Sequence, residues 1–124
     1  MMQRLVGIFR IETDLQEAIG ELAELRRRWA NVRVTGGRAF NPGWDLVFEL
    51  DNLLTISEAI ARSALQRTES RGAHSRLDYP DIDAAGWGGR NSAVAPGPDG
   101  TMNVFTTPIP ATPGELRGLL AGDH

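Results

Sequence analysis

Charged and polar side chains concentrate between positions 67 and 80, and this stretch is the part of the chain best equipped for chemistry. Besides Tyr79, it holds six ionisable side chains in fourteen residues, including His74, the one histidine away from the end of the chain. A histidine base needs a nearby nucleophile or substrate and a third group that orients its ring. Glu69 or Asp78 could orient this ring, and Ser70 and Ser75 are hydroxyl groups close to it in sequence.

A hydrolytic site is disfavoured, because the chain lacks the Gly-x-Ser-x-Gly turn that presents a catalytic serine. Ion networks that are buried or half-buried hold the orientation of a segment more than they add stability. We therefore favour a polar network that ties the end of a helix to the rest of the molecule. Its members are Glu69, Arg71, His74 and Arg76. A small stand-alone enzyme centred on His74 is the minor alternative.

The remaining sequence offers no set of metal ligands and no cofactor motif. It has no cysteine and one internal histidine, and its aspartates at 81, 83 and 99 do not match a calcium-binding loop. The run from Gly86 to Gly89 lacks the Gly-x-Gly-x-x-Gly spacing of a dinucleotide site. We therefore expect this chain to bind no metal and no cofactor. Trp87, inside that run, is interpreted as a plug over the helices, and an anchor on a partner is the alternative.

Length and composition indicate one globular domain over residues 1–124. The net charge of −3 gives no electrostatic basis for binding nucleic acid. No run of about 18 apolar residues is present, so we expect no direct membrane insertion, and the N-terminus does not match a signal peptide. The absence of cysteine is compatible with a reducing compartment such as the cytoplasm.

Apolar periodicity predicts two helices near the N-terminus. The first is predicted over residues 2–9 from four positions on one face: Met2, Leu5, Val6 and Phe9. The second is predicted to begin at Thr13, a good N-cap with Gln16 three residues on, and to run to Trp29. A loop is predicted to follow over residues 31–41, where two consecutive glycines break the pattern.

A third and longer helix is predicted from Pro42 to Gln66, with Asn41 as its N-cap. It is apolar around most of its girth, as a central helix packed on two sides would be. Short connections between such helices predict an antiparallel three-helix bundle over residues 1–71. Gly72 is expected at the C′ position of this helix with a left-handed backbone.

Residues 72–124 are predicted to form an irregular extension with a short β-hairpin at about 91–107, because two extended runs flank a Pro- and Gly-rich turn. A last helical turn is expected from four residues: Glu115, Leu116, Leu119 and Leu120. The fold class is therefore mainly α.

The run Thr68-Glu69-Ser70-Arg71-Gly72-Ala73-His74, followed by Arg76, Asp78 and Pro80, resembles a known family. It is similar to the C-terminal domain of the succinate dehydrogenase / fumarate reductase flavoprotein subunit, and L-aspartate oxidase shares the pattern. The resemblance extends over nearly the whole chain. A Glu-Ser-Arg-Gly-x-His string at the end of a long helix is unusual, which makes the match specific.

The resemblance implies a non-catalytic domain of a protein that interconverts succinate and fumarate with FAD. The domain would pack on the flavin-binding domain and lie near the iron–sulfur subunit, in the cytoplasm or on the cytoplasmic face of the membrane as part of a respiratory complex. No catalytic or cofactor-binding residue carries over to this chain. The interdomain interface candidates are Glu69, Arg71, His74, Arg76 and Trp87.

Two alternatives stay open at this point. The chain could be the C-terminal domain of L-aspartate oxidase, since that enzyme shares the motif. It could also be an autonomous helical-bundle interaction module, in which Trp29, Trp44 and Trp87 serve as anchors.

Overall fold

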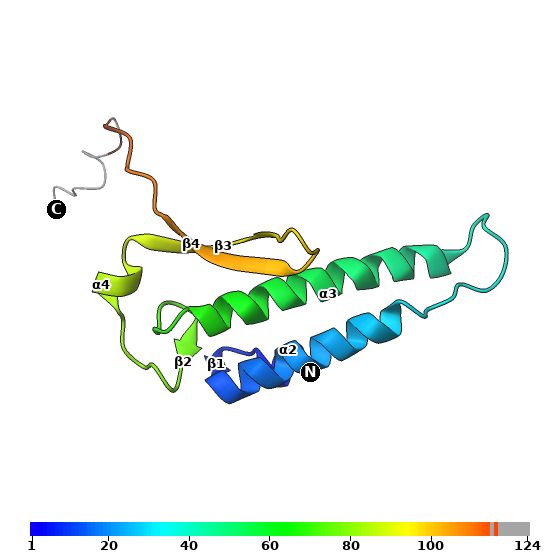
Figure 1. Cartoon of the computed structure of the whole chain (residues 1–124), viewed down its shortest axis with the longest axis horizontal. Helices are drawn as coiled ribbons and strands as arrows, with labels where there is room; N and C mark the ends of the chain where they lie inside the picture. Colours follow the sequence, from blue (N-terminus) through cyan, green and yellow to red (C-terminus); the bar gives the residue numbers. More distant parts are fainter. Residues whose placement is uncertain (115, 117–124) are drawn as a thin grey trace.

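The structure is a computed structural model that describes residues 1–114 and residue 116. Its elements in chain order are α1 (Met2–Leu5), β1 (Phe9–Arg10), α2 (Glu12–Trp29), α3 (Pro42–Gln66), β2 (Ser75–Arg76), α4 (Ala84–Trp87), β3 (Arg90–Pro96) and β4 (Met102–Pro108). The prediction of a mainly helical fold with a C-terminal hairpin is confirmed (Figure 1). Most of the predicted last turn lies outside the described residues.

The two long helices, α2 and α3, run antiparallel and form the body of the molecule (Figure 1). Their shared core is small and well buried: Leu5, Val6, Leu15, Ala18, Leu22, Leu54, Ala61 and Ala64. The buried positions of α2 repeat every three to four residues, which places them on one face. Alanine at several contact positions lets the helix backbones approach closely.

The first helix is much shorter than residues 2–9, because α1 ends at Leu5 after a single turn. The chain then becomes extended. Its strand β1 pairs in parallel with β2, which follows α3 in the sequence. Phe9, predicted to lie on the apolar helical face, is in this strand and is largely exposed. The third helical member of the bundle is therefore one turn that packs on α2 through Leu5 and Val6.

The starts of the long helices differ in how well the sequence predicts them. The prediction for α3 is confirmed, since the Asn41 side chain accepts a hydrogen bond from the Gly43 N–H and Pro42 opens the helix. The prediction for α2 is wrong by two residues. Ile11 occupies the N-cap position, and Thr13 lies within the first turn without capping it.

Gly72 has the predicted left-handed backbone, with φ of 59°. It does not end a helix, however, because α3 stops at Gln66 and Arg67 is its extended C-cap residue. Gly72 instead lies in a tight turn in which the main chains of Arg71 and His74 bond to each other. The end of α3 is capped by the side chain of Arg76.

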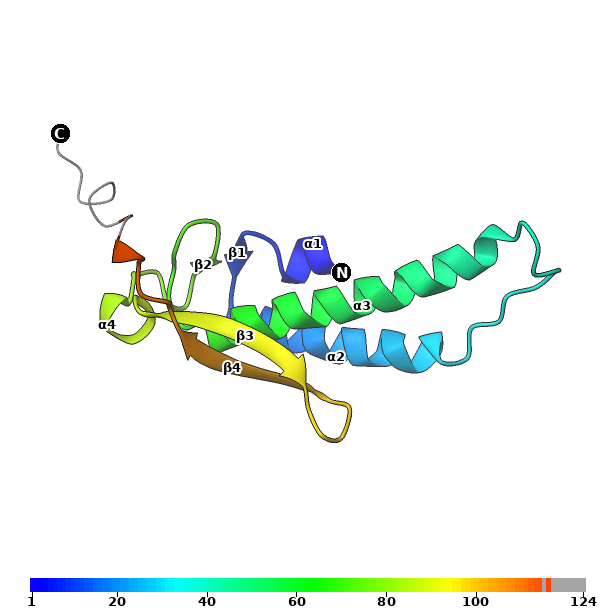
Figure 2. The same ribbon diagram turned by 90° about the horizontal axis from the view of Figure 1, so that it is seen from above.

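The hairpin of β3 and β4 lies within one residue of the predicted bounds at each end, and its register pairs Arg90 with Pro108 and Pro96 with Met102. It lies alongside α3 (Figure 2), and the Gln66 side chain donates to the Val104 carbonyl oxygen at 3.3 Å. Within residues 1–114, no helix is both long and apolar enough to span a bilayer.

Candidate functional site

The candidate site is the segment that follows α3, together with one residue of β1. We call it the polar junction, and its members are Arg10, Arg67, Glu69, Arg71, His74, Arg76 and Asp78. In Figure 1 it lies at the end of the helical pair opposite the α2–α3 loop, where β1 and β2 meet. Each member can be assigned a physical role from its contacts.

Arg76 is the centre of the polar junction, and its side chain is almost fully buried at 1% exposure. Its Nη1 donates to three main-chain oxygens at the end of α3: Ala64 (3.0 Å), Leu65 (3.2 Å) and Arg67 (3.4 Å). The last carbonyl groups of a helix lack partners within it and carry partial negative charge. A buried guanidinium group therefore caps α3 from outside the helix.

Asp78 extends this cap to the second long helix. Nε and Nη2 of Arg76 donate to its two carboxylate oxygens, both at 2.7 Å. The same carboxylate accepts the main-chain N–H of Glu12, the first residue of α2, at 2.9 Å. The start of a helix is partly positive and favours an anion. The Arg76–Asp78 pair thus joins the negative end of α3 to the positive end of α2.

Glu69 forms the second half of the polar junction and is fully buried. It accepts hydrogen bonds from the guanidinium groups of Arg67 and Arg71, in each case from Nε and Nη2. It also accepts the main-chain N–H of Asp83 at 2.9 Å. A buried carboxylate is tolerable only when its oxygens are satisfied in this way. Glu69 therefore fixes the loop that leads from α3 to α4.

These contacts shift the acid–base properties of both carboxyl groups. Hydrogen bonds from Arg71, and then from Arg67 and the Asp83 main chain, lower the pKa of Glu69 from 4.5 to about 2. Hydrogen bonds from Arg76 and from the Glu12 main chain lower the pKa of Asp78 from 3.8 to about 2. Both groups therefore stay ionised in the folded state well below the pH at which they would protonate in the unfolded chain.

We expect acid to destabilise this chain in a defined window. A lowered folded-state pKa gives stability that is complete above the unfolded pKa and is lost as the pH falls through the folded pKa. The free energy of unfolding should therefore fall from about pH 4.5 to about pH 2, as the urea midpoint at pH 6, 4 and 3 would reveal. In Asp78→Asn the fall should be shallower, and an identical slope in the variant would contradict the assignment.

His74 contacts neither of the carboxylates that could have oriented it. Its Nδ1 lies 2.7 Å from Nη1 of Arg10, and its Nε2 lies 3.0 Å from the Arg67 carbonyl oxygen. Arginine only donates and a carbonyl only accepts, so the ring is neutral and carries its proton on Nε2. Burial and the nearby charges of Arg10, Arg76 and Arg67 lower the pKa of His74, which agrees with a neutral ring.

Trp87 closes the polar junction from the side of α4 and is 9% exposed. Its indole N–H donates to the Thr68 hydroxyl at 3.3 Å, and the Arg67 guanidinium lies 5.0 Å from the ring centroid. Such a contact between a cation and an aromatic face is favourable by about 1 kcal/mol. Trp87 thus covers the segment after α3, whereas the buried core cluster of the helices does not include it.

The predicted network of Glu69, Arg71, His74 and Arg76 forms as adjoining sets of bonds rather than as one chain. Arg71 joins Glu69, and Arg76 joins Asp78, whereas His74 is held by Arg10 and by main chain. Among residues 1–114, no three metal-ligating side chains cluster as a metal site requires. The polar junction can hold segments together, but the imidazole is engaged on both nitrogens and has no hydroxyl partner.

Sequence reasoning missed Arg10 entirely. It lies 64 residues from His74, in a stretch predicted to connect two helices. The parallel pairing of β1 with β2 brings it there, since Phe9 pairs with Ser75 and Arg10 with Arg76. A two-residue strand leaves no periodic signal in the sequence, so nothing local could have revealed this contact.

Comparison with known proteins identifies the family to which this domain belongs. Residues 1–114 match the family model described as the fumarate reductase flavoprotein C-terminal region. This chain belongs to that family. The resemblance of the motif between Thr68 and Pro80 is thereby confirmed.

Relatives with curated names agree with this family. The chain is 45% identical over 82 residues to the succinate dehydrogenase flavoprotein subunit of Coxiella burnetii, which covers 65% of this chain and 14% of the relative. It is 34% identical over 118 residues to the fumarate reductase flavoprotein subunit of Mycobacterium tuberculosis, covering 92% of this chain and 20% of the relative. The chain therefore spans one fifth or less of the length of these relatives.

Solved structures share the fold as well as the sequence. A structure of Mycobacterium smegmatis Sdh1 in complex with UQ1 superposes with a TM-score of 0.81 at 46% identity, covering 96% of this chain and 20% of that chain. A quinol-fumarate reductase with menaquinol molecules superposes with a TM-score of 0.82 at 33% identity, covering 90% of this chain and 20% of that chain. The family domain thus recurs as a part of flavoproteins about five times longer.

Proposed function

We propose that this chain is the non-catalytic C-terminal domain of an FAD-dependent flavoprotein that interconverts succinate and fumarate. Its task is to pack on the flavin-binding part of the same polypeptide. The observation that carries this proposal is the extent of the match: residues 1–114 fit the family domain, and that domain is about one fifth of each flavoprotein it resembles.

The chemistry of the polar junction supports a role in packing. Its most buried charges, on Glu69 and Arg76, are already satisfied by other groups of this chain. His74 has a partner on each nitrogen and lies beside cations, which disfavours a second proton on the ring. A general base needs a free lone pair within reach of a substrate proton. The flavin, the substrate and the catalytic residues therefore belong to the larger part of the protein.

The interface candidates divide by exposure. The Arg71 side chain is 41% exposed and can meet a neighbouring domain directly, and His74 lies partly at the surface. Glu69, Arg76 and Trp87 are buried and would not touch the partner. They would contribute indirectly, by fixing the loop that carries Arg71 and His74. In this arrangement the surface would be rigid before it meets its partner, which lowers the entropic cost of packing.

The same proposal places the domain in a larger respiratory complex. The domain would also lie near an iron–sulfur subunit, within a respiratory complex on the cytoplasmic face of the membrane. The relatives described above carry succinate dehydrogenase or fumarate reductase names, which favours that branch over L-aspartate oxidase. The flavin would be FAD, bound outside this chain.

The proposal is tested by adding this chain to the M. tuberculosis fumarate reductase flavoprotein subunit truncated before the matched segment. Retained flavin absorbance would first establish that the truncated subunit is folded. We expect a complex by sedimentation, and we expect Arg71→Met to weaken it about tenfold, or about 1.4 kcal/mol. Arg27→Met, a highly exposed cation on α2, is the matched control and should bind normally. Failure of the unaltered chain to bind would count against the proposal.

A further inference from the structure

A stripe of large apolar side chains on α3 is exposed to solvent. Four of them lie three, four or seven residues apart, which places them on one face of the helix. Their exposed fractions are 65% for Leu46, 59% for Leu53, 57% for Ile56 and 44% for Ile60. We call this set the α3 stripe. The exposed Glu49 lies on the same face, so the stripe is apolar with one acidic residue within it. Exposed apolar side chains gathered on one face of a small domain are typical of an interaction site.

The α3 stripe is the side of α3 that its two neighbours leave uncovered. The helix contacts α2 along one side and the β3–β4 hairpin along another. Figure 2 shows most of α3 unobstructed between the hairpin and α1. The helix is apolar on three sides, and its neighbours cover two of them. Burial of the third side against a partner would therefore be favourable.

The α3 stripe runs into the polar junction without a break. A cavity at this end of the helix is lined by Ile56, Ala59 and Ile60 on one side and by Arg10 and His74 on another. The apolar face and the charged surface proposed above to meet the flavin-binding part are therefore neighbouring parts of one surface. A single partner can cover both.

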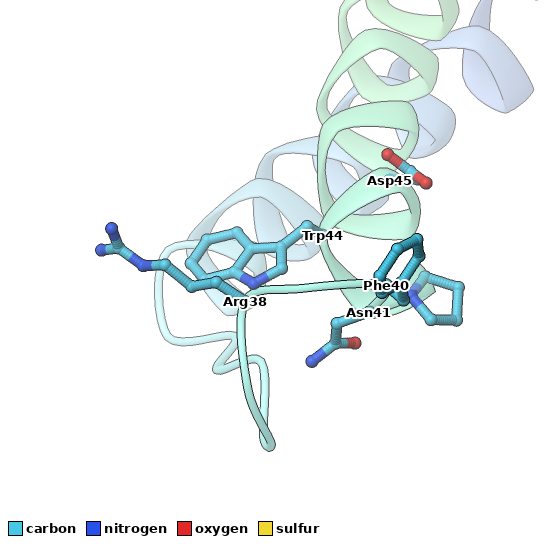
Figure 3. Close-up of a pocket in the computed structure, with 6 residues that line it drawn as sticks. Arg38, Phe40, Asn41, Trp44 and Asp45 are labelled. Atoms are coloured by element: carbon cyan, nitrogen blue, oxygen red, sulfur yellow. The ribbon is translucent and has the colours of Figure 1, made fainter.

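The other end of α3 presents an aromatic side chain in a strained conformation. Phe40 has a φ of 54°, which is unusual for a residue other than glycine, and its ring is completely exposed. The loop is held in this form by Asn41, whose side chain donates to the carbonyl oxygens of Thr35 and Gly37, both at 2.8 Å. In Figure 3 the Phe40 ring lies beside the start of α3, away from Trp44. Strain that exposes a large apolar ring indicates a group held ready for a partner.

We propose that Phe40 and the α3 stripe form one docking surface, about 30 Å long at a rise of 1.5 Å per residue, for the larger part of the same flavoprotein. The occupant is argued from two facts. The family domain is about one fifth of its relatives' chains, so a large partner is covalently attached in them. The surface is also continuous with the polar junction, so the inference rests on the proposed function and extends it along the whole helix.

The test compares thiol labelling in the free chain and in a full-length protein. The chain contains no cysteine, so single substitutions give a clean signal. The variants are Phe40→Cys, Leu53→Cys, Ile60→Cys and Arg71→Cys, with Arg27→Cys on the outer side of α2 as the control. Each is made in this chain alone and in the M. tuberculosis flavoprotein subunit whose matched segment is replaced by this chain. Mass spectrometry of tryptic peptides restricts the readout to the introduced thiol.

We expect rapid labelling of all five variants in the free chain. In the full-length protein, labelling at 40, 53 and 60 should slow at least tenfold, whereas labelling at 27 should not change. Protection at 71 without protection at 53 and 60 would overturn this inference and leave the proposed function standing. No protection at any of the positions would overturn both. Slower labelling at 53 and 60 in the free chain as its concentration rises would also overturn it, in favour of self-association.

Discussion

Replacement of Arg76 by methionine should lower the free energy of unfolding by about 3–5 kcal/mol, the range seen when one partner of a buried ion pair is removed. Arg76 is 1% exposed, and its guanidinium caps three carbonyl groups at the end of α3 while it pairs with Asp78. Methionine fills a similar volume but leaves those carbonyls and the carboxylate without their donor. Urea denaturation followed by circular dichroism measures the loss.

Two further variants make this result interpretable. Arg62→Met removes a side chain that is 38% exposed and paired with Glu58 on the same helix, so it should cost less than about 1 kcal/mol. Arg76→Lys keeps the charge, but an ammonium group lacks the planar set of N–H donors that contacts the carboxylate and the helix end together. The loss of stability should therefore lie between those of the other two variants. Equal losses for Arg62→Met and Arg76→Met would show that Arg76 does not have the capping role derived from its contacts.

Replacement of Glu69 by glutamine should be the second most damaging polar change, at about 3 kcal/mol. The amide has nearly the shape of the carboxylate, but it carries no charge and turns one acceptor into a donor. Arg67 and Arg71 would then face each other without the anion between them, and the N–H of Asp83 would compete for the single remaining oxygen. The loop between α3 and α4 should loosen as a result.

Hydrogen exchange measures this loosening directly, since the Asp83 N–H should lose protection in Glu69→Gln before α2 does. Glu17→Gln is the matched control, because the Arg4–Glu17 pair is largely exposed and its loss should leave stability unchanged. Normal protection at Asp83 in Glu69→Gln would contradict the view that this carboxylate fixes the loop.

The sequence was sufficient for the features that rest on local patterns. Period and composition placed α2 and α3, because a stripe of apolar residues is visible within a dozen positions. Asn41 followed by Pro42 located the start of α3, since that cap acts within two residues. The hairpin and the left-handed glycine at 72 were predictable for the same reason: turn chemistry is local.

Other features depend on contacts between residues distant in sequence, and only the tertiary structure decided them. The Asp78 carboxylate accepts the first N–H of α2 from 66 residues away. The N-terminus of α2 is therefore satisfied by a distant residue, and the prediction of Thr13 as its N-cap was wrong. Arg10 reaches His74 only because β1 pairs with β2, and Arg76 ends α3 in place of a glycine. Local chemistry therefore determined which elements form. How their polar ends satisfy one another was set by the folded chain, since a buried charge takes its partner from whichever segment packing brings within reach.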